Sequence, residues 1–398
     1  MITGIIFDAV RKNGGSYQMS INNLLTFVDN FKKNKIKHIV LTHNKNLDLD
    51  KLKIKYQIIK ISIWDYIFCI FQNIKVLKFF LKIFNLYSPF EKKLSKKNIH
   101  LLIFFFTSWK AFLLKKINFT ATILDTCHLD FQGKKKFKEI NFYVFWFREY
   151  IYKNILPLAY CIITESDDLK KKIVKLYKLK FNSIISISNL PFILMKNKKK
   201  LNIKRDLLIK YNIVGKFYFY PAQFWEHKNH IIILKAIKKL KLKEINTNFI
   251  FCGKDQGNLK YINNKISEYG IQDNVKIIGY VRDDELLELY KLSIALVMPS
   301  YFGPTNIPPV EAWSLKVPVA YSSLNINHGK NAAVYFDPDS VNDLVKAILK
   351  LDTLKIRNKL IFNGIKRFKN IKKENKSGHK KFTSYVSRLI ENSENSIN

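Results

Sequence analysis

The sequence predicts an α/β protein with two domains, each built on a doubly wound parallel sheet that helices cover on both faces. Two observations support this prediction. The chain has 398 residues, which is more than a single hydrophobic core ordinarily supports. Short apolar runs alternate with segments of helical periodicity along most of its length, and this alternation is typical of parallel sheets with crossover helices.

Six apolar runs form a first series, and we expect each of them to be a strand. They cover residues 4–9, 38–42, 99–106, 120–125, 160–166 and 183–188. Two of these runs, HIVLT and IHLLIFFF, are apolar almost throughout, as expected for parallel strands that are buried on both faces. Between the first two strands, Ser16 is expected to cap a helix. The apolar residues of that helix recur partly at helical spacing, at Met19, Leu24, Phe27, Val28 and Phe31.

Five further runs form a second series, at 216–222, 248–253, 275–280, 294–300 and 317–322. The helix after the first of these runs carries one apolar stripe, made of Ile233, Leu234, Ile237 and Leu240. The charged and poorly periodic segment 195–205 separates the two series and is expected to be a linker. We therefore expect two Rossmann-like domains, an N-terminal one over 1–195 and a C-terminal one over 196–375.

The chain is strongly basic, with a formal net charge of +38 from 69 basic and 31 acidic residues. Three explanations are open: an AT-rich genome that favours Lys, Ile and Asn, attraction to an anionic membrane surface, or binding of nucleic acid. Only 7 of the 69 basic residues are Arg, which reads bases and phosphates better than Lys does. Because no nucleic-acid-binding motif is present either, we expect no nucleic-acid partner.

The four cysteines, Cys69, Cys127, Cys161 and Cys252, are far apart and form no C-x-x-C pair. This spacing predicts neither a zinc site nor a disulfide framework, and it fits a reducing compartment. We expect no signal peptide, because no basic segment precedes the first apolar run, and no uncharged stretch reaches ~18 residues. The expected location is therefore cytoplasmic. The amphipathic region 72–96 is a candidate for peripheral contact with the inner face of the plasma membrane, with an ordinary core helix as the alternative.

In open α/β sheets, ligands bind at the carboxyl ends of the strands, so the loops after the predicted strands hold the candidate site residues. After the first strand, Gly14 and Gly15 lead into a helix, where glycine lets backbone N–H groups approach an anion. A plain turn is the alternative there. After 120–125, Asp125 and His128 could bind or deprotonate a substrate hydroxyl, with a structural histidine as the alternative.

The second series carries more candidates. In KFYFYPAQFWEHKNH, Gln223 and Lys228 follow a strand, and a lysine at a helix start suits a phosphate group. A surface lysine is the alternative. The next two strands end at Gly253-Lys254 and at Gly279-Tyr280-Val281. Main-chain groups at these two strand ends could pair with the edge of a planar base.

The segment YFGPTNIPPVEAW places a single acid, Glu311, after two prolines. Proline suits a helix start because it lacks the N–H group that would have no partner there. We expect Glu311 in the first turn of this helix, where a carboxylate can hold the vicinal hydroxyls of a ribose. N–H groups of the preceding loop, at Thr305, Asn306 and Ile307, could meet the sugar or its diphosphate. An ordinary helix-start acid is the alternative.

Four motifs, PAQFWEHKNH, GYVRDDELLELY, PSYFGPTNIPPVEAW and LDTCHLDF, have the order and spacing of glycosyltransferase family 4, which the chain resembles best over 215–350. The resemblance implies a GT-B fold, in which two Rossmann-like domains face each other across a cleft and a last segment, 376–398, returns to the N-terminal domain. It implies that the C-terminal domain binds a nucleotide-diphosphate sugar and the N-terminal domain binds the acceptor. Transfer would retain the anomeric configuration, and neither a metal nor a cofactor besides the donor would be needed.

By this resemblance, Glu311 matches the acid that holds the ribose, and Lys228 matches the lysine that neutralises the diphosphate. Gly14-Gly15 matches the loop that closes over the phosphates, and Asp125 and His128 fall on the segment that lines the acceptor side.

Two positions depart from the family pattern. The first acid of its E-x(7)-E motif falls at Gly303, and the arginine that partners the lysine falls at Gln223. A branch of the family is similar at both places, with the PTNIPP segment supplying backbone donors instead. These departures leave the contacts to the donor sugar and the charge balance at the diphosphate open.

The expected function is metal-independent, hexosyltransferase-type transfer of a sugar from a nucleotide-diphosphate sugar to a glycan or lipid-linked acceptor. Its expected setting is the biosynthesis of a surface polysaccharide such as O-antigen, capsule or lipopolysaccharide. Lys228 and helix-start N–H groups would stabilise the leaving diphosphate, and Asp125 or the departing phosphate would accept the proton of the acceptor. Two alternatives are another GT-B nucleotide-sugar enzyme, such as an epimerase or a phosphorylase, and a non-enzymatic basic binding protein.

Overall fold

The structure is a computed structural model that describes residues 1–10, 14–130, 137, 141–191, 204–303 and 305–395. The chain divides into two compact units. The first comprises Met1–Thr126, Phe142–Ser188 and Glu374–Asn398, and the second comprises Cys127–Asn141 and Asn189–Lys373. The sequence places 127–141 in the N-terminal domain, but this segment groups with the second unit. Most of the expected linker at 195–205 lies outside the described residues, and residues 204 and 205 begin a helix.

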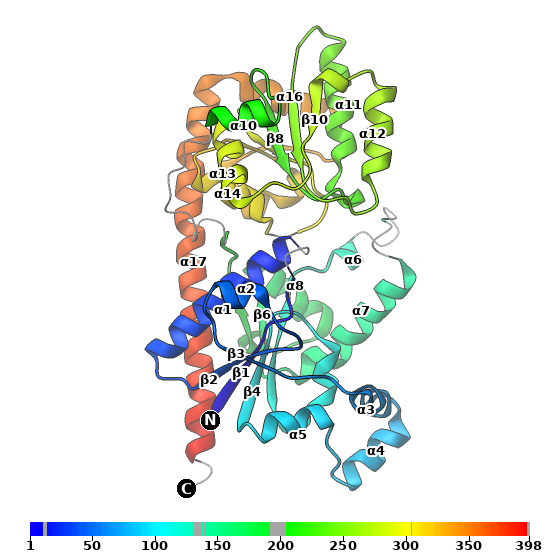
Figure 1. Ribbon diagram of the computed structural model, residues 1–398, viewed down its shortest axis with the longest axis vertical. Helices are drawn as coiled ribbons and strands as arrows, with labels where there is room; N and C mark the ends of the chain where they lie inside the picture. Colours follow the sequence, from blue (N-terminus) through cyan, green and yellow to red (C-terminus); the bar gives the residue numbers. More distant parts are fainter. Residues whose placement is uncertain (11–13, 131–136, 138–140, 192–203, 304, 396–398) are drawn as a thin grey trace. The chain divides into compact units, whose positions relative to one another are not determined.

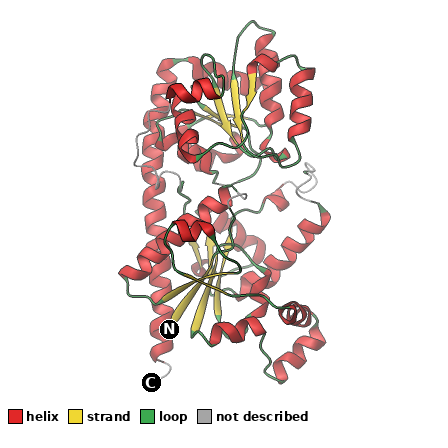
Figure 2. Ribbon diagram, viewed as in Figure 1, coloured by secondary structure: helices red, strands yellow, loops and turns green. Residues whose placement is uncertain are grey.

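Among the described residues, a seven-stranded parallel sheet with the order β3-β2-β1-β4-β5-β6-β7 forms the centre of the first unit (Figures 1 and 2). The strand order reverses between β1 and β4, because the chain adds strands on one side of β1 and then on the other. Open α/β sheets bind their ligands at the carboxyl ends of the strands beside such a point. Its strands are β1 (Ile2–Ile6), β2 (His38–Thr42), β3 (Tyr56–Ile58), β4 (Ile99–Phe104), β5 (Asn118–Ile123), β6 (Cys161–Thr164) and β7 (Ile184–Ser186).

The helix α1 follows β1 and packs Phe27 in the core of the first unit, where this ring stacks on Phe105 at 5.9 Å. The helix begins at Gly15 with Gly14 as its N-cap residue, so the prediction that Ser16 caps it is wrong. The helices of this unit are α1 (Gly15–Lys33), α2 (Leu47–Lys51), α3 (Ile63–Asn73), α4 (Lys75–Ile83), α5 (Pro89–Ser95), α7 (Phe142–Ile155) and α8 (Asp167–Tyr177).

The second unit is built on a six-stranded parallel sheet, counted over the part of the chain that the structure describes, with the order β10-β9-β8-β11-β12-β13. In this sheet too the strand order reverses beside the first strand of the unit, between β8 and β11. The strands are β8 (Tyr218–Pro221), β9 (Phe249–Cys252), β10 (Val275–Ile277), β11 (Leu296–Met298), β12 (Val319–Ser322) and β13 (Val334–Phe336).

The helices of the second unit cover this sheet. The predicted stripe of α11 is confirmed, because Ile233, Leu234, Ile237 and Leu240 are all buried in the core. The helices are α6 (Cys127–Asp130), α10 (Lys204–Lys210), α11 (His230–Lys241), α12 (Leu259–Glu268), α13 (Asp283–Leu292), α14 (Ile307–Ser314), α15 (Ile326–Gly329) and α16 (Val341–Asp352).

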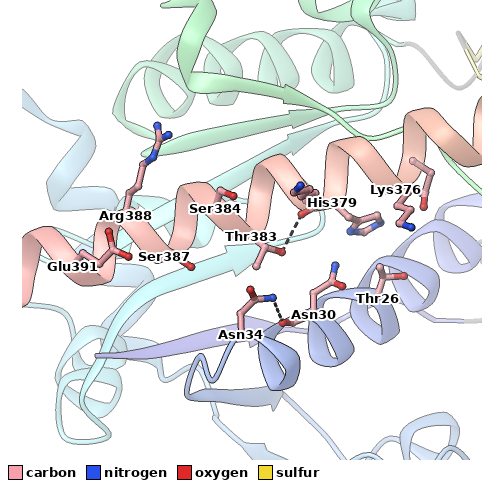
Figure 3. Close-up of a pocket in the computed structure, with 12 residues that line it drawn as sticks. Thr26, Asn30, Asn34, Lys376, His379, Thr383, Ser384, Ser387, Arg388 and Glu391 are labelled. Atoms are coloured by element: carbon pink, nitrogen blue, oxygen red, sulfur yellow. Dashed lines mark hydrogen bonds between the residues drawn. The ribbon is translucent and has the colours of Figure 1, made fainter.

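The long helix α17 (Leu354–Asn395) belongs to the second unit up to Lys373 and to the first unit from Glu374. In the first unit, Phe382 of α17 stacks on Phe27 of α1 with 4.6 Å between the ring centroids. A polar groove of about 560 Å³ lies between the two helices, and Figure 3 shows Asn30 and Asn34 of α1 on one side of it. These residues lie in the second half of α1, which runs away from the carboxyl ends of the strands, so this groove is separate from the strand-end loops.

Candidate active site

Four loops at the carboxyl ends of the second sheet are tied together by main-chain hydrogen bonds, and the Phe224 N–H after β8 joins the carbonyl of Lys254 after β9 at 3.0 Å. The Tyr301 N–H after β11 donates to the carbonyl of His227 after β8, at 3.0 Å. The Gly253 N–H after β9 donates to the carbonyl of Gly279 after β10, at 2.8 Å. A Cβ at Gly253 would lie 2.3 Å from the Ala222 carbonyl oxygen, so only glycine allows this close approach. The loops therefore form one fixed surface at this edge of the sheet.

Lys228 lies on that surface, at the end of the short 3₁₀ helix Glu226–Lys228. Its ammonium group is 3.4 Å from the hydroxyl of Ser300, a buried residue that follows β11. The next residue, Asn229, adopts a left-handed conformation with φ 56° and donates its side-chain amide to the Pro338 carbonyl at 2.8 Å. This turn fixes the position of Lys228 where α11 begins, so a cation stands at the helix end that favours anions.

Glu311 is buried, with 2% of its surface exposed, and is the fifth residue of α14. The expectation that it lies in the first turn is therefore wrong, because the helix already begins at Ile307. The Tyr290 hydroxyl donates to Glu311 Oε2 at 2.7 Å. Burial and then the Glu311 carboxylate raise the pKa of Tyr290, which keeps the phenol protonated as a donor. The tyrosine therefore holds the Glu311 carboxyl group in one orientation, as a hydroxyl-binding acid requires.

The loop before α14 is shaped by Gly303, which has φ 97°. A Cβ at this position would lie 2.6 Å from Asn306 Oδ1. The Asn306 side-chain amide donates to the Gly303 carbonyl at 2.9 Å and to the Tyr321 hydroxyl at 3.0 Å. Gly303 is thus part of a turn that only glycine fits well. Asn306 is the N-cap residue of α14, Ile307 begins this helix, and Thr305 is half-buried just before them.

Four other predicted donor residues occupy the same edge of the sheet. The Lys254 ammonium group lies 5.1 Å from the ring centroid of Tyr280, which is 60% exposed. Val281, beside that ring, is buried. The Gln223 side chain accepts a hydrogen bond from the Trp225 indole N–H at 3.1 Å. An exposed ring with a cation over it is suited to stacking against a planar base.

In the first unit, the predicted site residues stand at two strand ends. Gly14 has φ 60°, and Gly15 opens α1 after β1. Asp125 follows β5 and pairs with the guanidinium group of Arg148 on α7, with 2.7 Å between Oδ1 and Nη2. Asp125 would therefore have to release Arg148 before acting as a base.

The structure does not place Asp125 and His128 in one compact unit, since the units divide between Thr126 and Cys127. His128 is buried in α6. The segment that contains it contributes Phe137, whose ring packs edge-on against Phe302 of the second unit, with 4.8 Å between the centroids.

A cluster of three charged or titratable side chains in the first unit was missed by the sequence analysis. Asp8 follows β1, His43 follows β2, and Lys110 follows β4. The Lys110 ammonium group is 2.5 Å from Asp8 Oδ2 and 2.5 Å from His43 Nε2. His43 Nδ1 lies 2.6 Å from the carbonyl of Ile59, which can only accept, so Nδ1 carries a proton. The other ring nitrogen, Nε2, faces Lys110 and lies 3.4 Å from Asp8 Oδ2.

Burial alone would raise the pKa of Asp8. The hydrogen bond from His43 and the charge of Lys110 outweigh burial and hold this pKa below its ordinary value. Asp8 is thus an ionised acceptor group. The signal that could have found this cluster is the position of its members, each at or just after the end of a predicted strand. The apolar run 4–9 instead absorbed Asp8 into the strand.

A small cavity of about 190 Å³ opens beside Asp8. Its walls are mostly apolar and include the rings of Trp109 and Phe147, while Thr107 and Ser108 add hydroxyl groups. The cavity can admit a polar group to Asp8 and hold an apolar segment next to it. No group of three or more His, Cys, Asp or Glu side chains that could hold a metal ion occurs among the described residues.

Residues 210–367 match the family described as "Glycosyl transferases group 1". This range contains both Lys228 and Glu311. The group 1 region thus lies within the second unit, whose described sheet begins at Tyr218.

Comparisons with individual proteins extend beyond the group 1 region. The chain is 26% identical over 196 residues to the O-antigen chain mannosyltransferase RfbU of Salmonella typhimurium. The aligned region covers 48% of this chain and 51% of the relative. The chain spans about half the length of the curated relatives it matches.

Two solved structures resemble the whole chain. A glycosyltransferase from Rickettsia africae has a TM-score of 0.71 at 14% identity and covers 98% of both chains. HepE of Anabaena, in complex with UDP and glucose, has a TM-score of 0.69 at 14% identity and covers 97% of this chain and 100% of its own. Together with the two parallel sheets, these likenesses show that the fold is GT-B.

Proposed function

We propose that the protein transfers a sugar from a nucleotide-diphosphate sugar to an acceptor in the biosynthesis of a surface polysaccharide. The observation that carries this proposal is the fixed position of Lys228, which the Asn229 turn holds beside Ser300 at the strand ends of a group 1 region. Two relatives add support, since RfbU is named an O-antigen chain mannosyltransferase and the HepE structure contains UDP and glucose.

Each donor group then has a proposed partner in the second unit. Lys228 neutralises the diphosphate, and Glu311 accepts hydrogen bonds from the ribose hydroxyls. The exposed Tyr280 ring with Lys254 stacks on the base, with main-chain groups at Gly253 and Val281 near its edge. N–H groups of the 305–307 loop and the Gln223 side chain bind the sugar or the diphosphate. They take the place of the acidic side chain that the resemblance puts at position 303, where this chain has glycine.

The charge that develops during transfer fits this arrangement. Cleavage of the bond between the sugar and the phosphate leaves positive charge on the sugar and negative charge on the diphosphate. Lys228 and the N–H groups at the start of α11 stabilise the leaving group, which is where a fixed cation lowers the barrier most. We propose that transfer retains the anomeric configuration, needs no metal or other cofactor, and moves a hexose. Nuclear magnetic resonance of the product linkage and activity in the presence of a chelator test the first two points.

On the acceptor side, we propose that Asp8 binds the acceptor hydroxyl, with Lys110 and His43 holding it in place. Because its pKa is lowered, Asp8 is a weak base, so it orients the hydroxyl while the departing phosphate takes the proton. The glycines 14 and 15 close over the donor phosphates. Asp125 and His128 remain proposed acceptor-side residues. The acceptor is a glycan or a lipid-linked glycan, and the proposed location is the cytoplasm, at the inner face of the plasma membrane.

Calorimetry and thermal unfolding with a panel of nucleotide diphosphates and their sugar conjugates test the donor site. We expect one nucleotide sugar to bind the wild type, and Glu311→Ala to weaken that binding by about tenfold or more, because a charged hydrogen-bond partner is lost. Glu268→Ala on α12 is a matched control, since Glu268 is an exposed acid on the same unit. Incubation of the bound nucleotide sugar with cell-envelope glycolipid then tests transfer through release of the nucleotide diphosphate.

Two other results would contradict the proposal. Conversion of the nucleotide sugar into an isomer without release of the diphosphate would support an epimerase. No binding across the panel, together with salt-dependent binding of nucleic acid, would instead support a basic binding protein without enzymatic activity.

A further inference from the structure

The first unit exposes an unusual number of large apolar side chains on α3, α4 and α7. Of the nine residues of α4 only Leu81 is buried, and of the eleven residues of α3 only Asp65 and Phe68 are buried. The apolar faces of these helices therefore point away from the core. Trp64 is 66% exposed and Phe79 is 62% exposed. Exposed apolar surface on this scale marks a site of interaction with a protein or a membrane.

The three helices form one surface, which we call the α3–α4–α7 face. Ile74 joins α3 directly to α4. The Tyr150 hydroxyl of α7 donates to the Asn73 side chain at the end of α3, at 2.5 Å. Trp146, one turn earlier on α7, stacks on the Tyr150 ring at 5.3 Å and is itself 57% exposed. Figure 1 shows the three helices on the same side of the first unit.

The charge on this face has one sign. Lys75, Lys78 and Lys82 of α4 are exposed among its apolar residues. The acids of α3 and α7 are turned inward, because Asp65 is 0% exposed and Glu149 is 8% exposed. The face therefore presents aromatic rings and lysines with no exposed acid on its three helices. A second copy of the chain, with the same positive face and a net charge of +38, would be repelled by it.

An anionic lipid surface complements both properties. Lysines are attracted to acidic headgroups, and Trp, Tyr and Phe rings bury themselves at the boundary between headgroups and acyl chains. The helices α3 and α4 are too short to cross a bilayer. Within the described residues, no helix is both long enough and apolar enough to span one. The arrangement that suits this face is therefore contact with the membrane surface.

We propose that the α3–α4–α7 face binds an anionic lipid bilayer, with its aromatic side chains inserted at the headgroup level and its lysines on the acidic lipids. Docking itself does not depend on the transfer reaction. Its consequence for the acceptor does rest on the proposed function. Phe147 of α7, and Trp109, which stacks on Tyr66 of α3, line the cavity that reaches Asp8. A lipid-linked acceptor can therefore pass its head from the membrane to Asp8 over a short apolar path.

The test is flotation of the full-length protein with phosphatidylcholine vesicles, with and without phosphatidylglycerol. We expect binding that requires phosphatidylglycerol and weakens with salt. The double variant Phe79→Ser/Phe80→Ser should lower the partition coefficient by about tenfold or more, because two inserted rings are lost. Lys75→Gln/Lys78→Gln/Lys82→Gln should lower it by a similar factor and flatten the salt dependence.

Matched controls carry the same changes elsewhere on the chain. Phe362, on α17 in the second unit, is 71% exposed, and Phe362→Ser should leave binding within about twofold of the wild type. Lys355→Gln/Lys359→Gln/Lys366→Gln removes the same charge from exposed positions of α17 and should also have a small effect. Nucleotide-sugar binding and thermal unfolding of each variant show that it is folded, so a failure of docking is separate from a failure of the donor site.

A second readout places the rings in the lipid. Vesicles with brominated acyl chains should quench the tryptophan fluorescence of the wild type, and Trp64→Phe should lower this quenching. Equal vesicle binding by the patch variants and the controls would overturn the proposal in favour of adsorption by overall charge. Absence of binding to phosphatidylglycerol vesicles would also overturn it. So would a dimer in sedimentation velocity that Phe79→Ser/Phe80→Ser abolishes, because the face would then be an interface between copies.

Discussion

The Lys110 ammonium group lies 2.5 Å from the Asp8 carboxylate, although the two residues are 102 positions apart in the sequence. This ion pair joins the segments after β1 and β4, the two strands between which the strand order of the first sheet reverses. It also puts a carboxylate with a lowered pKa at the opening of an aromatic cavity. These properties make Asp8 the residue of the proposed acceptor site whose role is most directly testable.

We predict that Asp8→Asn lowers kcat/KM for the acceptor by about 10- to 100-fold, because a charged hydrogen-bond acceptor is replaced by a neutral one. Donor affinity, measured by calorimetry, should be unchanged. Asp29→Asn is the control, since Asp29 is an exposed acid of α1 in the same unit. Equal activity of the two variants would exclude Asp8 from acceptor binding.

Lys110→Met should change the pH dependence of transfer. In the wild type, the folded pKa of Asp8 lies below its ordinary value, so Asp8 stays ionised in mild acid and its protonation should not limit the rate there. Without the lysine, the hydrogen bond from His43 remains but less of the raising effect of burial is offset, so the pKa of Asp8 rises and the acidic limb of kcat/KM moves to higher pH. Lys110→Arg should keep the limb of the wild type. A limb that is the same in all three proteins would show that Lys110 does not set the charge of Asp8.

Lys228→Ala should weaken binding of a nucleotide diphosphate by about 1.5–3 kcal/mol, because the cation beside Ser300 is lost. Binding of the corresponding nucleoside should change little, since it has no phosphate for the lysine to meet. Lys235→Ala provides the control, because Lys235 is exposed on α11, the helix that Lys228 precedes. Calorimetry on both ligands separates the two effects. A uniform loss for diphosphate and nucleoside would mean that the substitution disturbs the loop rather than the charge.

Gly303→Glu introduces an acid where the resemblance to glycosyltransferase family 4 places one, and we predict that it impairs the protein. The backbone at Gly303 has φ 97°, and a Cβ there would lie 2.6 Å from Asn306 Oδ1. The strain should cost about 1–2 kcal/mol of stability and disturb the cap of α14. Gly303→Ala should show the same loss in urea denaturation, because the clash comes from Cβ. Full stability and tighter donor binding of the Gly303→Glu variant would show instead that the loop accepts the acid.

Much of the fold could be predicted because central parallel strands are apolar on both faces. Each of the eleven predicted strands overlaps a strand of the structure. The two that were missed, β3 and β13, lie at the edges of their sheets. They are three residues long, and the two exposed residues of β3, Gln57 and Ile58, give no buried apolar run. Short edge strands of this kind are held by pairing with a neighbour, which a local pattern does not reveal.

The candidate site was predictable only where local sequence and strand position coincide. Lys228 and Gly303 fall in short loops whose residues identify them. The partners of Glu311 and Asp125 could not be predicted, since Tyr290 and Arg148 are brought to them by tertiary packing across 21 and 23 positions. Asp8 was missed because the predicted strand 4–9 included it, although β1 ends at Ile6. Its partner Lys110, 102 positions away, could not be predicted from the local sequence.

Buried histidines should make the protein less stable in mild acid, and His379 is the clearest case. It is 1% exposed and packs edge-on against Phe27 at 5.1 Å. Within the described residues, neither of its ring nitrogens has a hydrogen-bond partner. Burial lowers its pKa from 6.5 to about 4. Between these two values the unfolded chain binds more protons than the folded one, so stability is lost as the pH falls from about 6.5 towards 4.

The measurement is urea denaturation of the wild type and His379→Phe at about pH 7.5 and pH 5. The pKa shift implies that His379 contributes about 2 kcal/mol to the loss of unfolding free energy between these two conditions. Phenylalanine keeps an aromatic ring against Phe27 but cannot take up a proton, so His379→Phe should lose correspondingly less stability on acidification. His100→Phe, at an exposed position of β4, should lose as much as the wild type. If His379→Phe also loses as much as the wild type, protonation of His379 does not drive the acid sensitivity of this packing between α1 and α17.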